Sequence, residues 1–490
     1  MLGVKLKPGV VRVGTKLESA GRFWDAHLVR WGEGGEMLAI KGWRLRSAAA
    51  AMAGRPRALL AWKDPDGDRW VGFGTNSNFY VQNASGDLYD ITPDGLTPGL
   101  ADSTVRTGYG AGPYGRGAYG APRPDTGNPA PPSMPSMDLW DGDLVFCLDA
   151  DKKVYRWELD TDEPGEVVPN APTNCEFFFV TDDGFGVALC GSEVVNSDKG
   201  NIEVWETALD NQARSFPLRT SGQLMCGKKV TGGSLLLTNT DCWLMRYVGY
   251  PDVHEYLRQG SAGNGIISRA AIADYDQGVV WMGANSFFVY NGYVQTLPCE
   301  VWDVVFNNIN PAQKAKITAV HLAAAKSVRF MYPSSAAIEI DRYVEWNYQL
   351  NCWTIGTMDR TCGADAGVFT NPLMCSPTGM TYEHEVGFDY TGQPLPYAET
   401  GPFQLGKGSN LMEHQAFFPD EKTPGDMSFT FFPSTMPDAD ETVVGPFPGE
   451  QKIDALFQGL WVRIRYQTVR LTDWRIGDSK MYVLTGDAYP

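Results

Sequence analysis

Residues 278–290 read GVVWMGANSFFVY: an apolar run, a short polar turn and a second run rich in aromatic residues. The same layout occurs in RWVGFGTNSNFYVQ at 69–82, LVFCLDADKKVYRWE at 144–158 and SLLLTNTDCWLMRY at 234–247. Apolar and aromatic runs on either side of a small polar turn are typical of a β-hairpin. The hairpin is therefore the repeating unit of this chain.

The spacing of these hairpins indicates the fold. The units begin at Val71, Leu144, Gly186, Leu235, Val279 and Val328. From Leu144 onward the starts recur about every 42 to 49 residues, which is the length of a β-propeller blade. We therefore predict a mainly β protein with a β-propeller over residues 54–392.

The interval between the first two units is longer because a loop is inserted at 106–137. Three related pieces, YGAGP, YGRGA and YGAPR, begin in it at Tyr109, Tyr114 and Tyr119, and a Pro-rich stretch follows. Gly and Pro at this density do not build a packed core. Two interpretations stay open: a flexible surface linker, or a projecting loop whose tyrosines pack against a neighbouring subunit.

The two ends of the chain lack the repeat. Residues 21–45 suggest a strand, a turn at 32–36 and a second strand, and the best helical candidates are short, at 298–308 and 312–317. In the C-terminal part, apolar residues alternate with polar ones as in half-buried strands, at Phe429, Phe431, Val462, Ile464 and Tyr466. Closing a propeller brings its first and last blades side by side, so we predict that residues 1–53 and 393–490 form one smaller β-rich platform domain.

The composition limits the possible functions. The formal net charge is −17 and the pI is about 4.8, so the surface as a whole should repel nucleic acids and anionic membranes. The nine cysteines form no C-x-x-C pair, which predicts free buried thiols in a protein folded in a reducing cytosol. No apolar stretch approaches the roughly 18 residues of a membrane span, and MLGVKLKPGVV at the start has no apolar core, so we expect neither a membrane span nor a secretion signal.

No motif indicates catalysis. The five histidines have no second His at metal-ligand spacing, and no nucleophile elbow occurs. The sequence GQLMCGKK at 222–229 has Lys229 where a phosphate loop needs Ser or Thr, so we interpret it as a strand and a turn. We expect no enzyme activity, no cofactor and no bound metal.

Two acidic stretches resemble sites without matching them. Asp64, Asp66 and Asp68 alternate as in a calcium loop, but the Gly and Glu that such a loop needs at later positions are absent, and a hairpin turn explains them better. The tripeptide 383–385, Glu-His-Glu, could ligate a metal or position a base, but we favour an exposed charged turn.

Arg463 and Arg465 alternate with Val462, Ile464 and Tyr466. On one strand this alternation puts both arginines on the solvent or interface face. Arg is favoured over Lys in subunit contacts. We therefore prefer a subunit interface with an acidic neighbour over a local anion site.

The order of the motifs resembles a known family. GRFWDAHLVRWGEGGEM, RALLAWKDPDGDRWVGFGTNSNFYV, GDLYDITP, GYGAGPYGRGAYG and the later TGPFQLG and WRIG segments resemble the tail nozzle (tail tubular protein B) of short-tailed bacteriophages, over nearly the whole chain. The resemblance implies a virion structural protein, made in the host cytoplasm, that forms a homohexameric ring below the portal and adaptor. It implies a platform built from the terminal segments and a wall formed by a β-propeller. It also implies a central channel that holds DNA and passes it into the host without specific binding, with the tail adaptor and fibre proteins as partners.

Two other functions are compatible with a propeller. A tail enzyme acting on host polysaccharide would need carboxylates that converge on the channel mouth, with Glu383, Glu385 and Asp389 as candidates. A binding scaffold of the WD type would have recurring G-H and W-D signatures, which the sequence lacks. We expect the structural role.

Overall fold

The structure, a computed structural model, describes residues 2–46, 51–105, 129–260, 263–406, 410–436 and 440–488. Helices are short in this part of the chain: α1 (Trp302–Phe306) and the 3-10 turns η1 (Lys16–Ser19), η2 (Lys314–Lys316) and η3 (Ala323–Ala325). The two helical candidates of the sequence contain α1 and η2. Within the described ranges, no helix has the length and apolar character that a membrane crossing requires.

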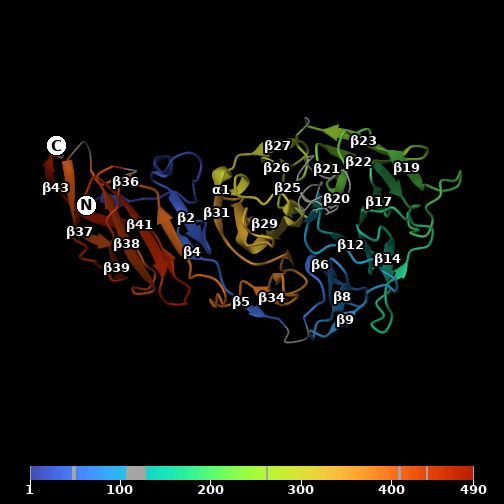
Figure 1. The fold of residues 1–490 in the computed structure, drawn as a ribbon, viewed down its shortest axis with the longest axis horizontal. Coiled ribbons are helices and arrows are strands. Elements are labelled where there is room, and N and C mark those ends of the chain that lie inside the picture. The colour runs from blue at the N-terminus through green and yellow to red at the C-terminus, as the bar shows by residue number, and fades with distance from the viewer. Residues whose placement is uncertain are drawn as a thin grey trace, which may run out of the picture.

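Seven consecutive four-stranded antiparallel sheets are arranged as the blades of a β-propeller, which confirms the predicted fold class (Figure 1). Blade 1 contains β6 (Pro56–Lys63), β7 (Arg69–Thr75), β8 (Phe79–Gln82) and β9 (Leu88–Asp90). Blade 2 contains β12 (Pro135–Trp140), β13 (Asp143–Leu148), β14 (Val154–Trp157) and β15 (Glu166–Val167). Blade 3 contains β16 (Phe177–Val180), β17 (Gly186–Cys190), β18 (Glu193–Asn196) and β19 (Arg214–Pro217). Blade 4 contains β20 (Leu224–Val230), β21 (Gly233–Thr238), β22 (Cys242–Gly249) and β23 (Val253–Gln259). Blade 5 contains β24 (Ile272–Tyr275), β25 (Gly278–Met282), β26 (Phe287–Tyr290) and β27 (Val294–Leu297). Blade 6 contains β28 (Thr318–Leu322), β29 (Ser327–Tyr332), β30 (Arg342–Asn347) and β31 (Cys352–Thr357).

Blade 7 closes the ring with a strand from the other side of the sequence. Its strands are β32 (Cys362–Ala364), β33 (Leu373–Cys375), β34 (Thr381–His384) and β5 (Trp43–Leu45), with Trp43 opposite His384. The first strand of blade 7, β32, packs against β6, the first strand of blade 1. Residues 43–45, expected in the N-terminal platform segment, thus form the outer strand of a propeller blade.

The predicted hairpins are the second and third strands of the blades. Residues 278–290, for example, form β25 and β26, which pair in antiparallel register from Val279 opposite Tyr290 to Met282 opposite Phe287. The inserted loop ends earlier than 137, because Pro135 already pairs with Leu148 at the start of β12. Its root is the short pair β10 (Thr104–Val105) and β11 (Pro129–Ala130).

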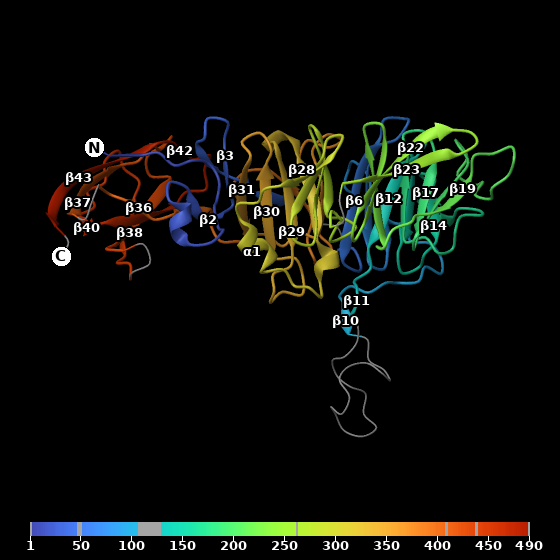
Figure 2. The ribbon, with the colours of Figure 1, turned by 90° about the horizontal axis from the view of Figure 1, so that it is seen from above.

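Both ends of the chain contribute to three further sheets, here called the terminal sheets, which lie beside the propeller (Figure 2). The first contains β1 (Leu2–Val4), β43 (Ser479–Ala488), β37 (Asn410–Phe418) and β40 (Phe457–Gly459). The second contains β2 (Phe23–His27), β35 (Tyr397–Thr400), β41 (Trp461–Thr468), β38 (Met427–Ser434), β39 (Val444–Pro448) and β36 (Phe403–Gln404), and the third contains β3 (Val29–Trp31), β4 (Met37–Ala39) and β42 (Arg475–Ile476).

One hydrophobic core runs from the terminal sheets into the propeller. The alternating residues Phe429, Phe431 and Ile464 are fully buried, as expected, and they belong to the same core cluster as Trp353 of blade 6. Strand β2 packs directly on β31. All nine cysteines are free thiols, eight of them buried, as the sequence predicted.

Candidate functional site

The first strands of all seven blades line a central cavity of about 360 Å³. Six charged side chains line it, and each has an opposite charge close by: Arg57, Asp138, Lys228, Lys229, Arg269 and Asp274. At one end of the cavity, Lys228 lies 2.8 Å from Asp274 and Lys229 lies 3.7 Å from Asp138. The first pair joins the inner strands of the adjacent blades 4 and 5, whereas the second joins blade 4 to blade 2.

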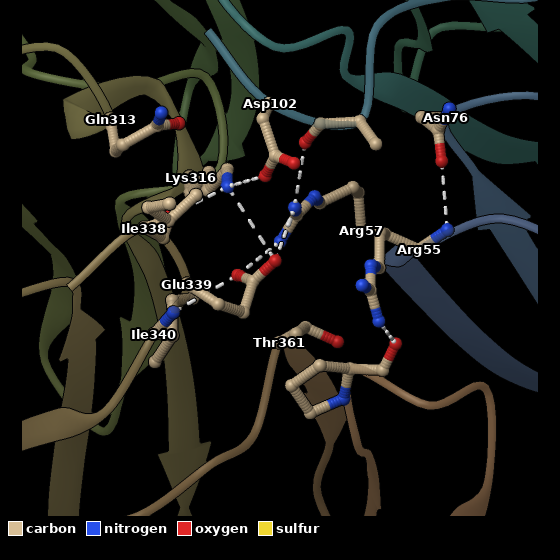
Figure 3. A network of polar contacts seen from close by, with 12 residues as sticks. Arg55, Arg57, Asn76, Asp102, Gln313, Lys316, Ile338, Glu339, Ile340 and Thr361 are labelled. Carbon is tan, nitrogen blue, oxygen red and sulfur yellow. Dashed lines mark hydrogen bonds and ion pairs between the residues drawn. The ribbon is translucent and has the colours of Figure 1, made fainter.

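Where the inner strands begin, a group of ion pairs here called the mouth network joins blades 1 and 6 (Figure 3). Arg57 donates from Nη1 and Nη2 to the two carboxylate oxygens of Glu339, at 2.7 Å each, and from Nη2 to the carbonyl of Ala101. Lys316 Nζ donates to Asp102 Oδ1 at 2.5 Å and lies 3.5 Å from Glu339 Oε2. Burial alone would raise the pKa of Glu339, but the hydrogen bonds and charge of Arg57 lower it below its ordinary value.

The mouth network fixes the root of the inserted loop. Asp102 and Ala101 directly precede β10, and Ser103 N donates to Gln313 Oε1. The side chains of Arg57 and Lys316 are fully buried, so the cations of this network lie between the blades, while Asp102 is nearly half exposed. The loop therefore leaves the propeller from a rigid base.

A second group of charges brings together Asp149, which follows β13 of blade 2, Glu176, which precedes β16 of blade 3, and Arg269, which precedes blade 5. Arg269 donates to Glu176 Oε2 at 3.0 Å, and its Nε lies 3.8 Å from Asp149 Oδ2. Burial raises the pKa of Asp149 to about 6, although Arg269 and the hydrogen bond from Met134 N partly oppose this. No group of three or more His, Cys, Asp or Glu side chains among the described residues is arranged to hold a metal ion.

The cavity is too small for nucleic acid to enter. A DNA duplex is wider than its own major groove, which is about 12 Å across. A cavity of about 360 Å³ whose wall carries six charged side chains has no room for it. Any DNA that this protein guides would have to pass along an outer face of the propeller.

Arg463 and Arg465 lie on β41, but their carboxylate partners belong to the same chain. Arg463 donates twice to Glu441, at 2.7 and 2.6 Å, and once to Glu399 at 2.8 Å, and it is only 8% exposed. Arg465 donates to Glu399 at 3.0 Å and lies over the ring of Tyr397. Glu399 and Glu441 of the same chain therefore already neutralise these two arginines, and the subunit interface expected here stays a prediction.

The other predicted interface residues, Tyr109, Tyr114 and Tyr119, lie outside the described residues. The calcium-like stretch at 64–68 is the turn between β6 and β7, in which Asp64 accepts hydrogen bonds from Asp68 N and Trp70 Nε1. The sequence GQLMCGKK contains most of β20, as the strand interpretation expected.

The tripeptide 383–385 is not an exposed turn, which corrects the expectation. His384 is 2% exposed and accepts a hydrogen bond from Arg360 Nε at 2.9 Å, and burial together with Arg360 holds its pKa well below the usual range. Glu383 accepts from Arg44 and Arg46. The cause is β5, which pairs with β34 and covers it.

Glu385 belongs to a second buried group, here called the junction network, between the propeller and the terminal sheets. Arg30 of β3 lies 2.8 Å from Glu385 and 3.5 Å from Glu345 of blade 6. Arg329 donates from Nε and Nη2 to Glu345, and Ser327 donates to the other oxygen of that carboxylate. Burial alone would raise the pKa of Glu345, but Arg329, Arg30 and Ser327 lower it to about 2.

Sequence reasoning missed both networks, although one of them left a signal. Arg329 and Glu345 lie inside the apolar strands SVRFMY and RYVEWN and face each other across the β29–β30 pair. A single charge of each sign inside two paired apolar strands is the pattern of a buried cross-strand ion pair. No comparable signal marks Lys316, whose partners come from loops.

The similarity of this chain to known proteins is distant. No protein-family model and no curated protein matches this chain. Similar solved structures include virginiamycin B lyase from Staphylococcus aureus, at 10% identity and a TM-score of 0.42, covering 68% of this chain and 96% of that one. They also include a streptogramin B lyase (9% identity, TM-score 0.40, 70% of this chain, 98% of that chain) and a chain of the mitotic checkpoint complex (10% identity, TM-score 0.39, 70% and 98%). None of them bears on what this chain does.

Proposed function

We propose that this protein is a virion structural protein, a subunit of the tail nozzle of a short-tailed bacteriophage, and that it has no enzymatic activity. The observation on which the proposal rests is the arrangement of the chain: a closed propeller is looped out between two terminal segments that share the same sheets. This is the order of parts that the family resemblance implies. Six such subunits in a ring would enclose a DNA channel between them, because the cavity of each propeller is too small to serve as one.

The charge distribution supports a structural role. Arg57 joins blade 1 to Glu339 of blade 6, Arg269, which precedes blade 5, pairs with Glu176 at the start of blade 3, and Arg30 joins the terminal sheets to Glu345 of blade 6. Such pairs fix the relative positions of the parts. The net charge of −17 would keep the wall of the channel from binding the DNA backbone.

A polysaccharide-degrading enzyme is the competing function, and the geometry favours it less. Its candidate carboxylates Glu383 and Glu385 are paired with Arg44, Arg46 and Arg30 at the outer side of blade 7, away from the central cavity. Asp389 accepts hydrogen bonds from the backbone and side chain of Thr391. These pairings leave none of the three candidates placed to act on a substrate at the channel mouth.

Imaging of purified virions by electron microscopy tests the proposal. We expect a ring of six subunits, each of 53.9 kDa, between the adaptor and the tip of the tail. A parallel assay on host polysaccharide should show no turnover. Turnover that Glu383→Gln abolishes, or absence of the protein from the virion, would overturn the proposed function.

A further inference from the structure

Most outer strand edges of this molecule are short or blunted. In the propeller, the outermost strands β5, β9, β15, β19 and β27 have two to four residues, and the longer β31 is covered by β2. In the terminal sheets, the edge strand β39 contains Pro446 and Pro448, and β40 has three residues. Short edges and edge prolines prevent a sheet from pairing with a second chain.

Two edges depart from this pattern. Strand β43 has ten residues, and β1 pairs with only Ser479, Lys480 and Met481 of it. Among the described residues, the stretch 482–488 has a strand partner on the β37 side alone, and it contains the exposed side chains Tyr482 and Leu484, each 42% exposed. Residues 482–485, YVLT, have high β-propensity, and the whole stretch has no proline and an unprotected row of backbone hydrogen-bonding groups.

The second open edge is β23 of blade 4, the longest outermost strand of the propeller, with seven residues. It pairs with β22 on one side and contains Leu257, which is 41% exposed. In Figure 1, β43 lies at the far end of the terminal sheets, and β23 lies in the half of the propeller that faces away from them. The two open edges are therefore different surfaces on distant parts of one subunit.

We propose that the stretch 482–488 of one copy pairs antiparallel with β23 of the next copy. One continuous sheet would then run from the terminal sheets of one subunit into blade 4 of its neighbour. A contact between two different surfaces of identical chains generates a closed ring when the rotation permits it, which is the symmetry that a hexamer needs. This inference rests on the proposed ring assembly and names the surface that builds it.

The two edges match in length and chemistry. Each open stretch has seven residues, and in the centred antiparallel register Leu484 of one copy lies opposite Leu257 of the other. Cross-strand apolar pairs of this kind stabilise a sheet, whereas like charges placed directly opposite each other destabilise it. The register therefore makes a residue-specific prediction.

Charge substitutions in the assembled protein test this contact. In sedimentation of concentrated protein, Leu484→Lys or Leu257→Lys should weaken association by about 10-fold or more. The double variant Leu484→Lys with Leu257→Glu should recover most of it, because every contact then joins opposite charges. Leu209→Lys, at a position 92% exposed between β18 and β19, is the matched control and should leave association unchanged. Unchanged thermal unfolding of each monomer shows that the variants fold.

Cross-linking gives a second readout. A chain with both Leu484→Cys and Leu257→Cys should form a ladder of linked subunits with a short bismaleimide, whereas Leu484→Cys with Leu209→Cys should not. An oligomer that forms normally in the Lys variants and gives no ladder would overturn this contact and leave the proposed function standing. A chain that stays monomeric would also overturn the contact, while a ring of six in virions would still support the nozzle. Absence of the protein from virions would overturn the proposed function as a tail nozzle subunit.

Discussion

The junction network and the mouth network each join parts of the molecule through two cations and two carboxylates, but solvent reaches them to different extents. At the junction, the Arg329 and Glu345 side chains are 0% and 2% exposed, and both lie on paired strands. At the mouth, Arg57 and Lys316 are equally buried, but Glu339 is 22% and Asp102 45% exposed. The comparison teaches that the Arg329–Glu345 pair, held by two paired strands, is sealed inside the core, whereas the loop carboxylates Glu339 and Asp102 keep contact with water.

The largest expected effect comes from removing the charge of the junction carboxylate. Glu345→Gln leaves Arg329 fully buried without its counter-charge, and breaking a buried pair in this way destabilises by about 3–5 kcal/mol. The urea midpoint of unfolding should fall accordingly. Glu255→Gln, at an exposed pair with Arg246, is the control and should change stability by less than about 1 kcal/mol. Equal effects of the two substitutions would contradict the distinction between sealed and open pairs.

The second-largest effect is expected from acid, which should weaken the junction network. The folded-state pKa of Glu345, about 2, lies below the value near 4.3 of an unfolded chain, so the ionised carboxylate stabilises the fold above that value. This contribution, about 3 kcal/mol, should be lost as the pH falls from about 4 to about 2. The stability difference between wild type and Glu345→Gln should shrink over the same range, as measured by urea unfolding at each pH. A difference independent of pH would argue against an ionised Glu345.

Asp149 should show the opposite trend at higher pH. Its folded pKa of about 6 lies above that of an unfolded chain, so the folded protein takes up this proton first and gains stability as the pH falls from about 6 to about 4. Asp149→Asn should abolish that trend without changing the loss between pH 4 and 2. If the trend persists in the variant, another group causes it.

At the mouth, Lys316→Met should have a moderate effect. It removes the hydrogen bonds to Asp102 and to the Ile338 carbonyl, but Glu339 keeps Arg57 and Asp102 can turn to water. We expect a loss of about 1–3 kcal/mol and faster amide hydrogen exchange at residues 100–105, the root of the inserted loop. Lys314→Met, at an exposed site two residues away, is the control. Unchanged exchange at the root would show that the ion pair does not hold the loop.

The smallest effect is expected for Asp102→Asn. This side chain is nearly half exposed, so its ion pair should contribute at most about 1 kcal/mol. Thermal unfolding of the variant should stay close to that of wild type. A loss as large as that of Glu345→Gln would erase the contrast between the two networks.

Much of the fold could be predicted from the sequence, because the second and third strands of six blades are long, apolar and regularly spaced. Each predicted start, from Val71 to Val328, lies in or directly beside the second strand of a blade. Blade 7 was missed because β33 has three residues and because its fourth strand, β5, comes from before the first blade. Pairing between such distant segments has no local sequence signal.

The candidate site could be predicted less well. Alternation correctly placed Val462, Ile464 and Tyr466 in the core, with Arg463 and Arg465 on the other face. It could not show that Glu399 and Glu441 lie against those arginines, because these carboxylates come from separate segments of the chain. The pairing of Lys316 with Asp102 likewise depends on ring closure, which brings residues 214 positions apart together.

The closure of the ring by β5 also affects how the protein is made. Residues 43–45 leave the ribosome early, but their partner β34 ends at His384, more than 300 residues later. At a synthesis rate of about 5–20 residues per second, the early strand waits for on the order of tens of seconds with its backbone groups unpaired. Blades 1 to 6 can form one after another as they emerge, whereas the last blade and the sheets beyond it can only be completed once nearly the whole polypeptide has been translated.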